Sequence, residues 1–258
     1  MKNSTQQLIE FNEDLQGIVN PVLFDREFHP DGLKEHFLIY SFGKAYKTHS
    51  AVLILCKNGY GQDAAILTRS LFELAITTLY ILKDPTDKRA EKWFDYDWIR
   101  RDKMYEHMKS ENRFINLIKD RVKDLEEDPI VEIKRMAQEV QNKHKYIKGL
   151  GWSDKNIFDM TKEVGLESLY PTVYKLHTEI HHSGVGNIND YFSLENDSVI
   201  MADVGPSQKW LDETLVAAFH FFSILTKEWD NLFKLSLSDG IDSLLKRWIE
   251  LVGDESKK

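Results

Sequence analysis

The sequence has little of the residues that break or cross-link a chain: one cysteine, six prolines and 13 glycines in 258 residues. The lone cysteine, Cys56, excludes an internal disulfide and a zinc site built from several cysteines. So few helix breakers favour long helices over short strands joined by turns. The most apolar stretch, 64–82, contains Arg69 and Glu73, so we expect no membrane span. These absences predict a soluble, cytoplasmic, helical protein with no disulfide partner.

Positively charged residues are also fewer than negatively charged ones. The chain carries 34 lysines and arginines against 42 aspartates and glutamates, which gives a formal net charge of −8. This balance excludes broad, charge-driven binding to nucleic acid, but it leaves room for a local basic patch. Hydrophobic residues make up 42% of the chain, which excludes intrinsic disorder and suffices for a sizeable core.

Apolar residues recur at helical spacing along most of the chain. Pro21 closes the first expected helix, and the pairs Asp84-Pro85 and Asp128-Pro129 are typical helix starts. The short connection 58–61 contains two glycines, so the helices on either side of it should pack as an antiparallel pair. We predict helices at 8–19, 31–57, 62–83, 86–127, 129–146, 154–164, 170–182, 206–236 and 241–252.

The expected fold is all-α, a single helical bundle of about seven helices that spans 1–258. It comprises an N-terminal helix and loop at 1–30, a core bundle at 31–236 and a C-terminal helix at 237–258. One helix, 86–127, is unusually long and charged. Glycines and turn residues interrupt the helical spacing near 184–206, which indicates a small loop or hairpin insertion.

Arg69 and Glu73 interrupt an otherwise apolar helix at a spacing of four, which places them one turn apart on the same face. A buried charge is costly unless it is paired, so we expect both side chains to be buried and in contact. One interpretation is an internal ion pair that fixes helix packing. The other is that Arg69 faces a cavity, is held by Glu73 and binds a phosphate or carboxylate.

A second group of polar residues follows Tyr170-Pro171. His177 and His181 are four apart, and Glu179-x-x-His182 has the spacing of carboxylate-bridged metal bundles. Those bundles need two such motifs, and this chain has one, so we expect no metal and no cofactor. His181 and His182 end a helix and enter a glycine-containing loop, where cationic or functional histidines are common.

Three motifs together resemble a bacterial, all-helical family of unknown function, domain of unknown function number 5677. They are Gly61-Gln-Asp63-Ala64-x-x-Leu67-x-Arg69-Ser70-Leu71-x-Glu73, then Asp84-Pro85, and then Tyr170-x-x-x-Tyr174 running into His181-His182-Ser183. The resemblance covers about residues 40–218 and carries no agreed activity. It implies that the candidate functional residues are Arg69, Glu73, Tyr174 and His181.

The chain more loosely resembles the helical ribonuclease-like superfamily found in toxin–antitoxin and phage-defence loci. Members place Arg and His four to six residues apart near a helix end, and two subunits form a metal-independent RNA-cleaving site. Arg101 and His107 have that spacing here, but the residue after Arg101 is Asp102, where those nucleases prefer a residue such as Asn. In such chemistry His moves a proton and Arg stabilises phosphate charge. A solvated helix face is the competing interpretation.

We therefore predict a binding, interaction or sensor module, with a link to toxin or phage-defence systems implied by the looser resemblance. Its expected ligand site, for an anion or RNA, comprises Arg69, Glu73, Tyr174, His181 and His182. The alternative is a ribonuclease-like effector whose catalytic pair is Arg69 with His181, or Arg101 with His107.

The expected partners are a second copy of the chain or another protein. Aromatic residues near the start of the long charged helix, Trp93, Tyr96 and Trp98, together with Met104, predict a homodimer surface.

Overall fold

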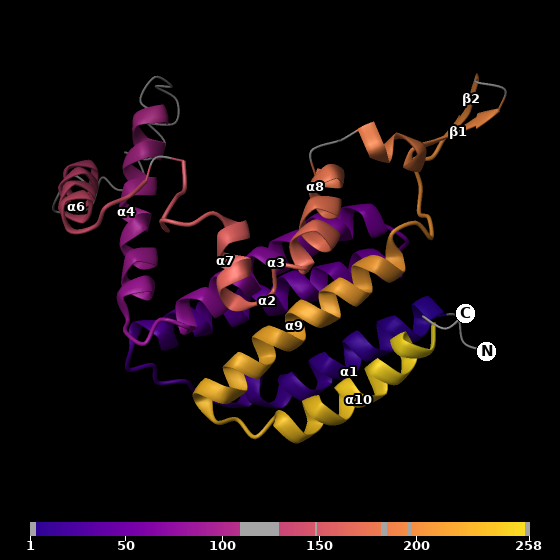
Figure 1. Cartoon of the computed structure of the whole chain (residues 1–258), viewed down its shortest axis with the longest axis horizontal. Coiled ribbons are helices and arrows are strands. Elements are labelled where there is room, and N and C mark those ends of the chain that lie inside the picture. The colour runs from indigo at the N-terminus through magenta and orange to yellow at the C-terminus, as the bar shows by residue number, and fades with distance from the viewer. Residues whose placement is uncertain (1–3, 109–128, 148, 182–184, 196–197, 256–258) are drawn as a thin grey trace. The chain divides into compact units, whose positions relative to one another are not determined.

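The computed structural model describes residues 4–108, 129–147, 149–181, 185–195 and 198–255. These residues form two compact units, one made of Met1–Lys83 with Ile157–Lys258 and the other of Asp84–Asn156. Helices dominate both units (Figure 1), so the predicted all-α class is confirmed. The single domain expected over 1–258 stays a prediction.

The first unit is built on long helices that pack around α9. Its principal helices are α1 (Ser4–Asp25), α2 (Leu33–Lys57), α3 (Gly61–Leu82), α9 (Leu211–Phe233) and α10 (Ser238–Glu255). Helix α9 contacts each of the other four, and α2 and α3 lie side by side as the predicted pair (Figure 1). An apolar core between these helices therefore holds the unit together.

Large aromatic side chains fill this core. Trp229 of α9 stacks on Phe42 of α2 at a ring-centroid distance of 4.0 Å, and both side chains are almost fully buried. Phe219 stacks on Trp248 of α10 at 3.9 Å. Stacked rings of this size bury much apolar area, which stabilises the packing of α9 against its neighbours.

The glycines between α2 and α3 have a specific structural role. Gly59 has a φ of +78°, and a Cβ on Gly61 would collide with the carbonyl oxygen of Lys209. The chain 206–210 therefore packs as an irregular segment against this connection, and α9 begins at Leu211. The predicted helix start at Pro206 is wrong for this reason.

Shorter elements connect α3 with α9 in the first unit. They are α7 (Ile157–Val164), the π-helical turn η1 (Tyr170–Tyr174), α8 (Lys175–His181), the 3₁₀ turn η2 (Val185–Asp190), and strands β1 (Phe192–Glu195) and β2 (Ser198–Ala202). The strands form an antiparallel hairpin with a register shift between Ser193 and Leu194. Of the two alternatives expected near 184–206, a loop or a hairpin, the structure has the hairpin.

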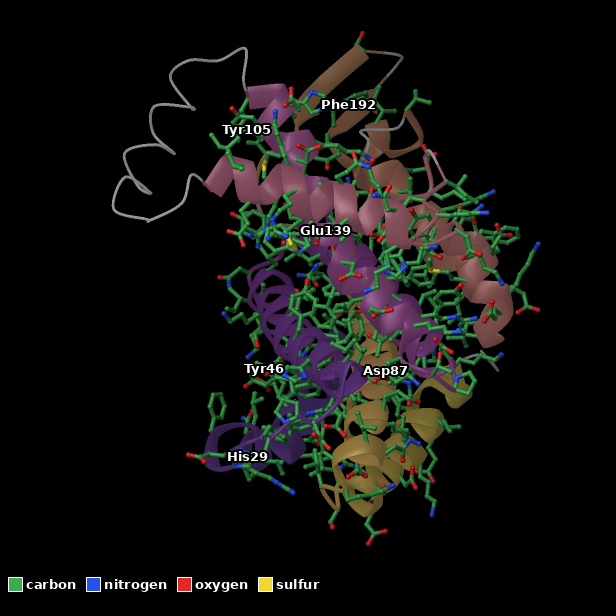
Figure 2. All side chains as sticks on the ribbon, turned by 90° about the vertical axis from the view of Figure 1, so that its left-hand side faces the viewer. His29, Tyr46, Asp87, Tyr105, Glu139 and Phe192 are labelled. Carbon is green, nitrogen blue, oxygen red and sulfur yellow. The ribbon has the colours of Figure 1, made fainter. Side chains whose placement is uncertain are left out.

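The second unit contains α4 (Lys88–Met108) and α6 (Pro129–Lys143), which pack against each other. Its buried core is small and comprises Ile99, Ala137 and Val140, with Tyr96, Trp98 and Tyr146 packed against them. Polar side chains, Glu139 among them, cover the exposed faces of these helices (Figure 2). Helix α6 begins at Pro129 as predicted.

Three predicted helix features need correction or lie outside the described residues. Pro21 lies inside α1, which continues to Asp25, so the prediction that Pro21 closes the helix is wrong. Helix α4 is described only to Met108, so the rest of the helix expected over 86–127 lies outside the described residues. The described residues contain nine α-helices, which equals the number of predicted helical ranges and exceeds the seven or so expected for the bundle.

Candidate functional site

Arg69 and Glu73 meet on α3 beside η1. Nη2 of Arg69 lies 3.2 Å from Oε1 of Glu73 and donates a hydrogen bond to Oη of Tyr174 at 3.0 Å. The guanidinium carbon also lies 4.8 Å from the centroid of the Tyr174 ring, within the range of a cation–π contact. The predicted contact between Arg69 and Glu73 is therefore confirmed, and Tyr174, another member of the predicted site, lies against the same guanidinium.

The burial of this pair differs from the expectation. The Arg69 side chain is 16% exposed, but that of Glu73 is 45% exposed, so the prediction that both are buried is wrong for Glu73. Glu73 is exposed because it lies on a face of α3 that the neighbouring elements cover only partly. The residues of this face are Ile66, Ser70, Glu73 and Thr77. The site is consequently open to solvent on the Glu73 side.

The hydrogen-bond donors of Arg69 are only partly used. Both of its polar contacts go through Nη2, and Nε is buried without a hydrogen-bond partner among the described residues. A guanidinium carries five N–H donors and cannot lose its charge in a protein. The group is therefore fixed in place while donors on its other nitrogens stay unpaired within the described part of the chain.

Tyr174 is the last residue of the π-helical turn η1. Its ring stacks on Tyr170 at 4.9 Å and lies 5.3 Å from Phe72. Burial raises the pKa of Tyr174 and the charge of Glu73 adds to this, against the opposing effect of the hydrogen bond from Arg69. The tyrosine is therefore a neutral hydroxyl at neutral pH. Single π-helical turns are rare and occur frequently at functional sites.

The three histidines at 177, 181 and 182, of which the last two belong to the predicted site, lie in different environments. His181 is the last residue of α8, and its side chain lies outside the described residues, as does the whole of His182. His177 is only 2% exposed. Burial lowers the pKa of His177 to about 4, so the ring is neutral near pH 7.

The alternative catalytic pair lies on α4 in the second unit. Arg101 Nε is 2.6 Å from Oδ2 of Asp97, and its guanidinium carbon lies 5.1 Å from the Trp98 ring centroid. Its side chain is 53% exposed, and His107 in the last turn is also exposed. These contacts account for Arg101 as part of a solvated helix face.

A second ionic cluster, which the sequence did not predict, connects α4 with the end of α6. Oδ2 of Asp95 lies 2.8 Å from Nζ of Lys143 and 2.7 Å from Nε2 of His144. Lys143 also pairs with Glu91 at 2.8 Å. Burial by itself would raise the pKa of Asp95, but the hydrogen bonds from Lys143 and His144 outweigh it and lower that pKa. The only signal in the sequence was Asp95 inside the aromatic run 93–98.

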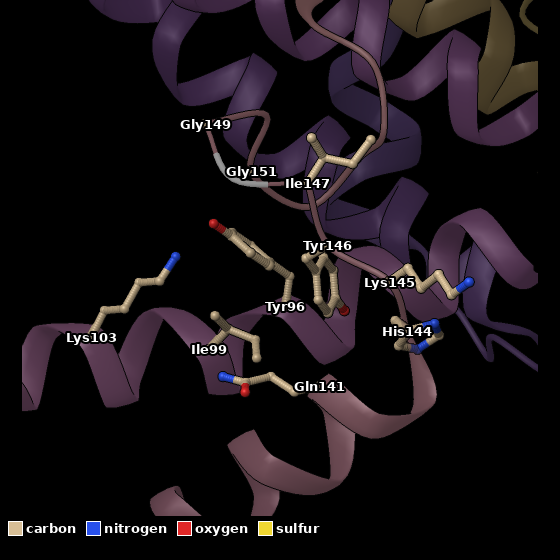
Figure 3. Close-up of a pocket in the computed structure, with 10 residues that line it drawn as sticks. All are labelled: Tyr96, Ile99, Lys103, Gln141, His144, Lys145, Tyr146, Ile147, Gly149 and Gly151. Carbon is tan, nitrogen blue, oxygen red and sulfur yellow. The ribbon is translucent and has the colours of Figure 1, made fainter.

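A cavity of about 620 Å³ adjoins this cluster in the second unit (Figure 3). The rings of Tyr96 and Tyr146 line it at a centroid distance of 5.2 Å, and Lys103 and Lys145 lie at opposite ends in the close-up.

Buried polar side-chain atoms without a partner occur among the described residues on Arg69, His177 and Ser223, which all belong to the first unit. The sites with unpaired buried polar groups are therefore in the first unit.

The dimer surface predicted on α4 is partly used within its own unit. Tyr96 and Trp98 pack against the core of the second unit, whereas Met104 is 54% exposed. The homodimer stays a prediction that light scattering can test. In the described part of the chain, His, Cys, Asp and Glu form no group of three that could hold a metal ion.

The fold and the site define an all-helical protein with a partly buried arginine held by a tyrosine and a glutamate. The chain belongs to the family of unknown function DUF5677, whose sequence model matches residues 35–199. That range contains Arg69, Glu73 and Tyr174. Comparison with curated proteins and with solved structures finds no match. Among the described helices, α3 alone is long and apolar enough to cross a membrane, and 56% of its most apolar window is buried.

Proposed function

We propose that this chain is a binding module that holds an anionic group, a carboxylate or a phosphate, at Arg69. The supporting observation is that the hydrogen bond and the ion pair of Arg69 both go through Nη2, while Nε and Nη1 have no hydrogen-bond partner among the described residues. The planar fork of arginine suits the bidentate recognition of carboxylates and phosphates, and here each such edge of the guanidinium pairs Nε or Nη1 with the Nη2 that Glu73 contacts.

The surroundings of Arg69 favour a strong interaction with an anion. Its side chain is mostly buried, so a charge-assisted hydrogen bond there is screened less by water than one on the surface. The Tyr174 ring and hydroxyl hold the guanidinium from one side. This preorganisation reduces the entropy that the side chain loses when a ligand binds.

Glu73 acts in this proposal as a displaceable counter-ion. Its carboxylate neutralises Arg69 in the empty site, and its side chain is 45% exposed. An exposed carboxylate can turn into water at little cost, since surface ion pairs contribute only about 0–1 kcal/mol. The incoming anion then replaces the Glu73 carboxylate next to Arg69. His181 and His182 stay predicted members of this site.

Calorimetric titration with inorganic phosphate, and separately with acetate, tests the proposal. We expect saturable binding of at least one anion to the wild-type chain and at least tenfold weaker binding to Arg69→Met, a loss of about 1.4 kcal/mol. Arg101→Met is the matched control, because Arg101 is paired with Asp97 on an exposed helix face. Equal binding by wild type and Arg69→Met, or equal loss in the Arg101→Met control, would contradict the proposal.

A further inference from the structure

The first unit contains a cavity of about 400 Å³ with mostly apolar walls. It lies between η1 with α8 on one side and α9 with α10 on the other, and Val173, Val216, Phe221 and Trp248 are among its lining residues. Its volume falls within the range of about 300–1,000 Å³ that is typical of small-molecule sites. The cavity does not contain Arg69, so it is separate from the proposed anion site.

His177 lines this cavity and has an unusual environment. Its side chain is buried, and Nδ1 has no hydrogen-bond partner among the described residues. His49, which is equally buried in the core, shows the ordinary arrangement. There Nε2 lies 2.7 Å from Oδ1 of Asn12, and Nδ1 lies 3.1 Å from Nε2 of Gln16. A buried polar atom without a partner costs about 1–3 kcal/mol, so the one on His177 calls for an explanation.

We propose that this cavity binds a small, uncharged and largely apolar molecule with one hydrogen-bonding group, for which His177 is the polar anchor. A neutral imidazole offers one donor and one acceptor, which suits a hydroxyl or an amide. The apolar walls accommodate the body of such a molecule, and its burial supplies most of the binding energy.

The charges around the cavity favour an uncharged ligand. Glu213 is exposed on the lining and repels an anion. Burial lowers the pKa of His177 to about 4 and also lowers that of His220, so neither ring supplies positive charge at neutral pH. An anionic ligand would therefore meet one negative charge and no compensating cation among these groups.

The π-helical turn η1 contributes to the cavity and to the arginine site through adjacent residues. Thr172 and Val173 line the cavity, whereas Tyr174 accepts the hydrogen bond from Arg69. Because the wider turn displaces successive side chains from ordinary helical positions, this geometry can present both surfaces from one short segment. Because such turns are rare and occur frequently at functional sites, we interpret η1 as part of a binding site.

Two probes of nearly the same shape test the proposal, 4-ethylphenol and ethylbenzene. We expect the wild-type chain to bind 4-ethylphenol at least tenfold more tightly, because ethylbenzene leaves His177 without a partner. Calorimetry gives the affinities, and the ¹⁵N shift of His177 Nδ1 reports the hydrogen bond directly. Failure of both probes to bind, or equal affinities for the two, would overturn the proposal.

Three variants locate the interaction. His177→Phe keeps a ring in place, so it should still bind ethylbenzene but lose the preference for 4-ethylphenol. His220→Phe changes the other histidine of the lining and should keep that preference. Val216→Trp should fill the cavity and abolish binding of both probes. A preference that survives in His177→Phe, or that disappears only in His220→Phe, would show that His177 is not the anchor.

Circular dichroism melting checks that each variant is folded. If His177→Phe does not fold, the wild-type ¹⁵N titration decides instead. A saturable shift of His177 Nδ1 with 4-ethylphenol and none with ethylbenzene supports the proposal, and no shift with either overturns it. Because Arg69 does not line this cavity, failure here leaves the proposed anion site unaffected.

Discussion

The two units each contain an ionic cluster, and the two clusters differ in how completely their polar groups are paired. In the second unit, one oxygen of Asp95 is shared by Lys143 and His144, and Lys143 also pairs with Glu91. In the first unit, Arg69 contacts its partners through one nitrogen and leaves a buried Nε unpaired among the described residues. The paired contacts of Asp95 are typical of a structural ion-pair network, whereas the unpaired donors of Arg69 can still bind a ligand.

The difference follows from how each unit holds its helices. Helix α4 has only Ala90 and Ile99 fully buried, so ionic contacts must help to attach it to α6 and the chain that follows. Helix α3 buries thirteen residues, most of them apolar, so its position does not depend on Arg69. A charged residue that packing does not require, in a helix this apolar, is a better candidate for function than one that holds a helix in place.

The largest expected effect is on the Asp95 cluster. Asp95→Ala leaves Lys143 and His144 without their shared acceptor, and we expect it to lower the free energy of unfolding by about 2 kcal/mol. Urea denaturation followed by circular dichroism measures the change. Asp97→Ala is the control, since its exposed pair with Arg101 should contribute less than about 1 kcal/mol. Equal losses in both variants would remove the distinction between the clusters.

A smaller effect is expected for Tyr174→Phe. The variant keeps the ring beside the guanidinium but removes the hydroxyl that accepts from Arg69, which should cost about 1 kcal/mol of stability. Tyr170→Phe is matched to it, because Tyr170 stacks on the same ring and its hydroxyl makes no hydrogen bond with described residues. A loss in Tyr170→Phe as large as that in Tyr174→Phe would mean that the hydroxyl contact is unimportant.

The pH dependence of the free energy of unfolding should show whether the charge of Asp95 stabilises the second unit. The pKa of Asp95 is lowered in the folded chain, so its contribution is present above the unfolded pKa and is lost as pH falls through the folded pKa. The stability difference between wild type and Asp95→Asn should therefore shrink when denaturation at pH 7 is repeated at pH 3. A difference that stays constant between these pH values would show that the charge of Asp95 does not stabilise the unit.

The smallest expected change in stability is that of Glu73→Gln. Its side chain is 45% exposed, so losing the pair with Arg69 should cost less than about 1 kcal/mol. The same change removes the competing carboxylate and should strengthen phosphate or acetate binding two- to fivefold in calorimetry. Glu167→Gln, at an exposed position in the same unit, should change neither quantity. Weaker anion binding in Glu73→Gln would mean that Glu73 supports the ligand instead of competing with it.

Local patterns were enough to predict much of the fold and one contact of the site. The spacing of four between Arg69 and Glu73 determines their contact within one helix, and Pro129 marks the start of α6. The interrupted helical spacing located the insertion near 184–206 but left a loop and a hairpin as alternatives. These features depend on residues close together in the chain, which is where sequence patterns are most informative.

Contacts between distant segments were not predictable in the same way. The family resemblance placed Arg69 and Tyr174 in one site, but helical spacing did not predict the hydrogen bond between them, which joins residues 105 positions apart. The pair of Asp95 with His144 spans 49 positions and was not predicted. The half-exposure of Glu73 and the burial of His177 depend on which neighbours cover each helix face. Helical spacing gives the faces of a helix but not the identity of what packs on them.

The guanidinium Nε–H signal of Arg69 in a ¹H–¹⁵N NMR spectrum tests the central claim most directly. Its assignment comes from the Arg69→Met variant, and the titrant is inorganic phosphate. The account predicts a saturable shift of the Arg69 signal, while the signal of Arg101, whose Nε is already paired with Asp97, changes little. An Arg69 signal that does not move, or that moves linearly and in parallel with that of Arg101, would contradict the account.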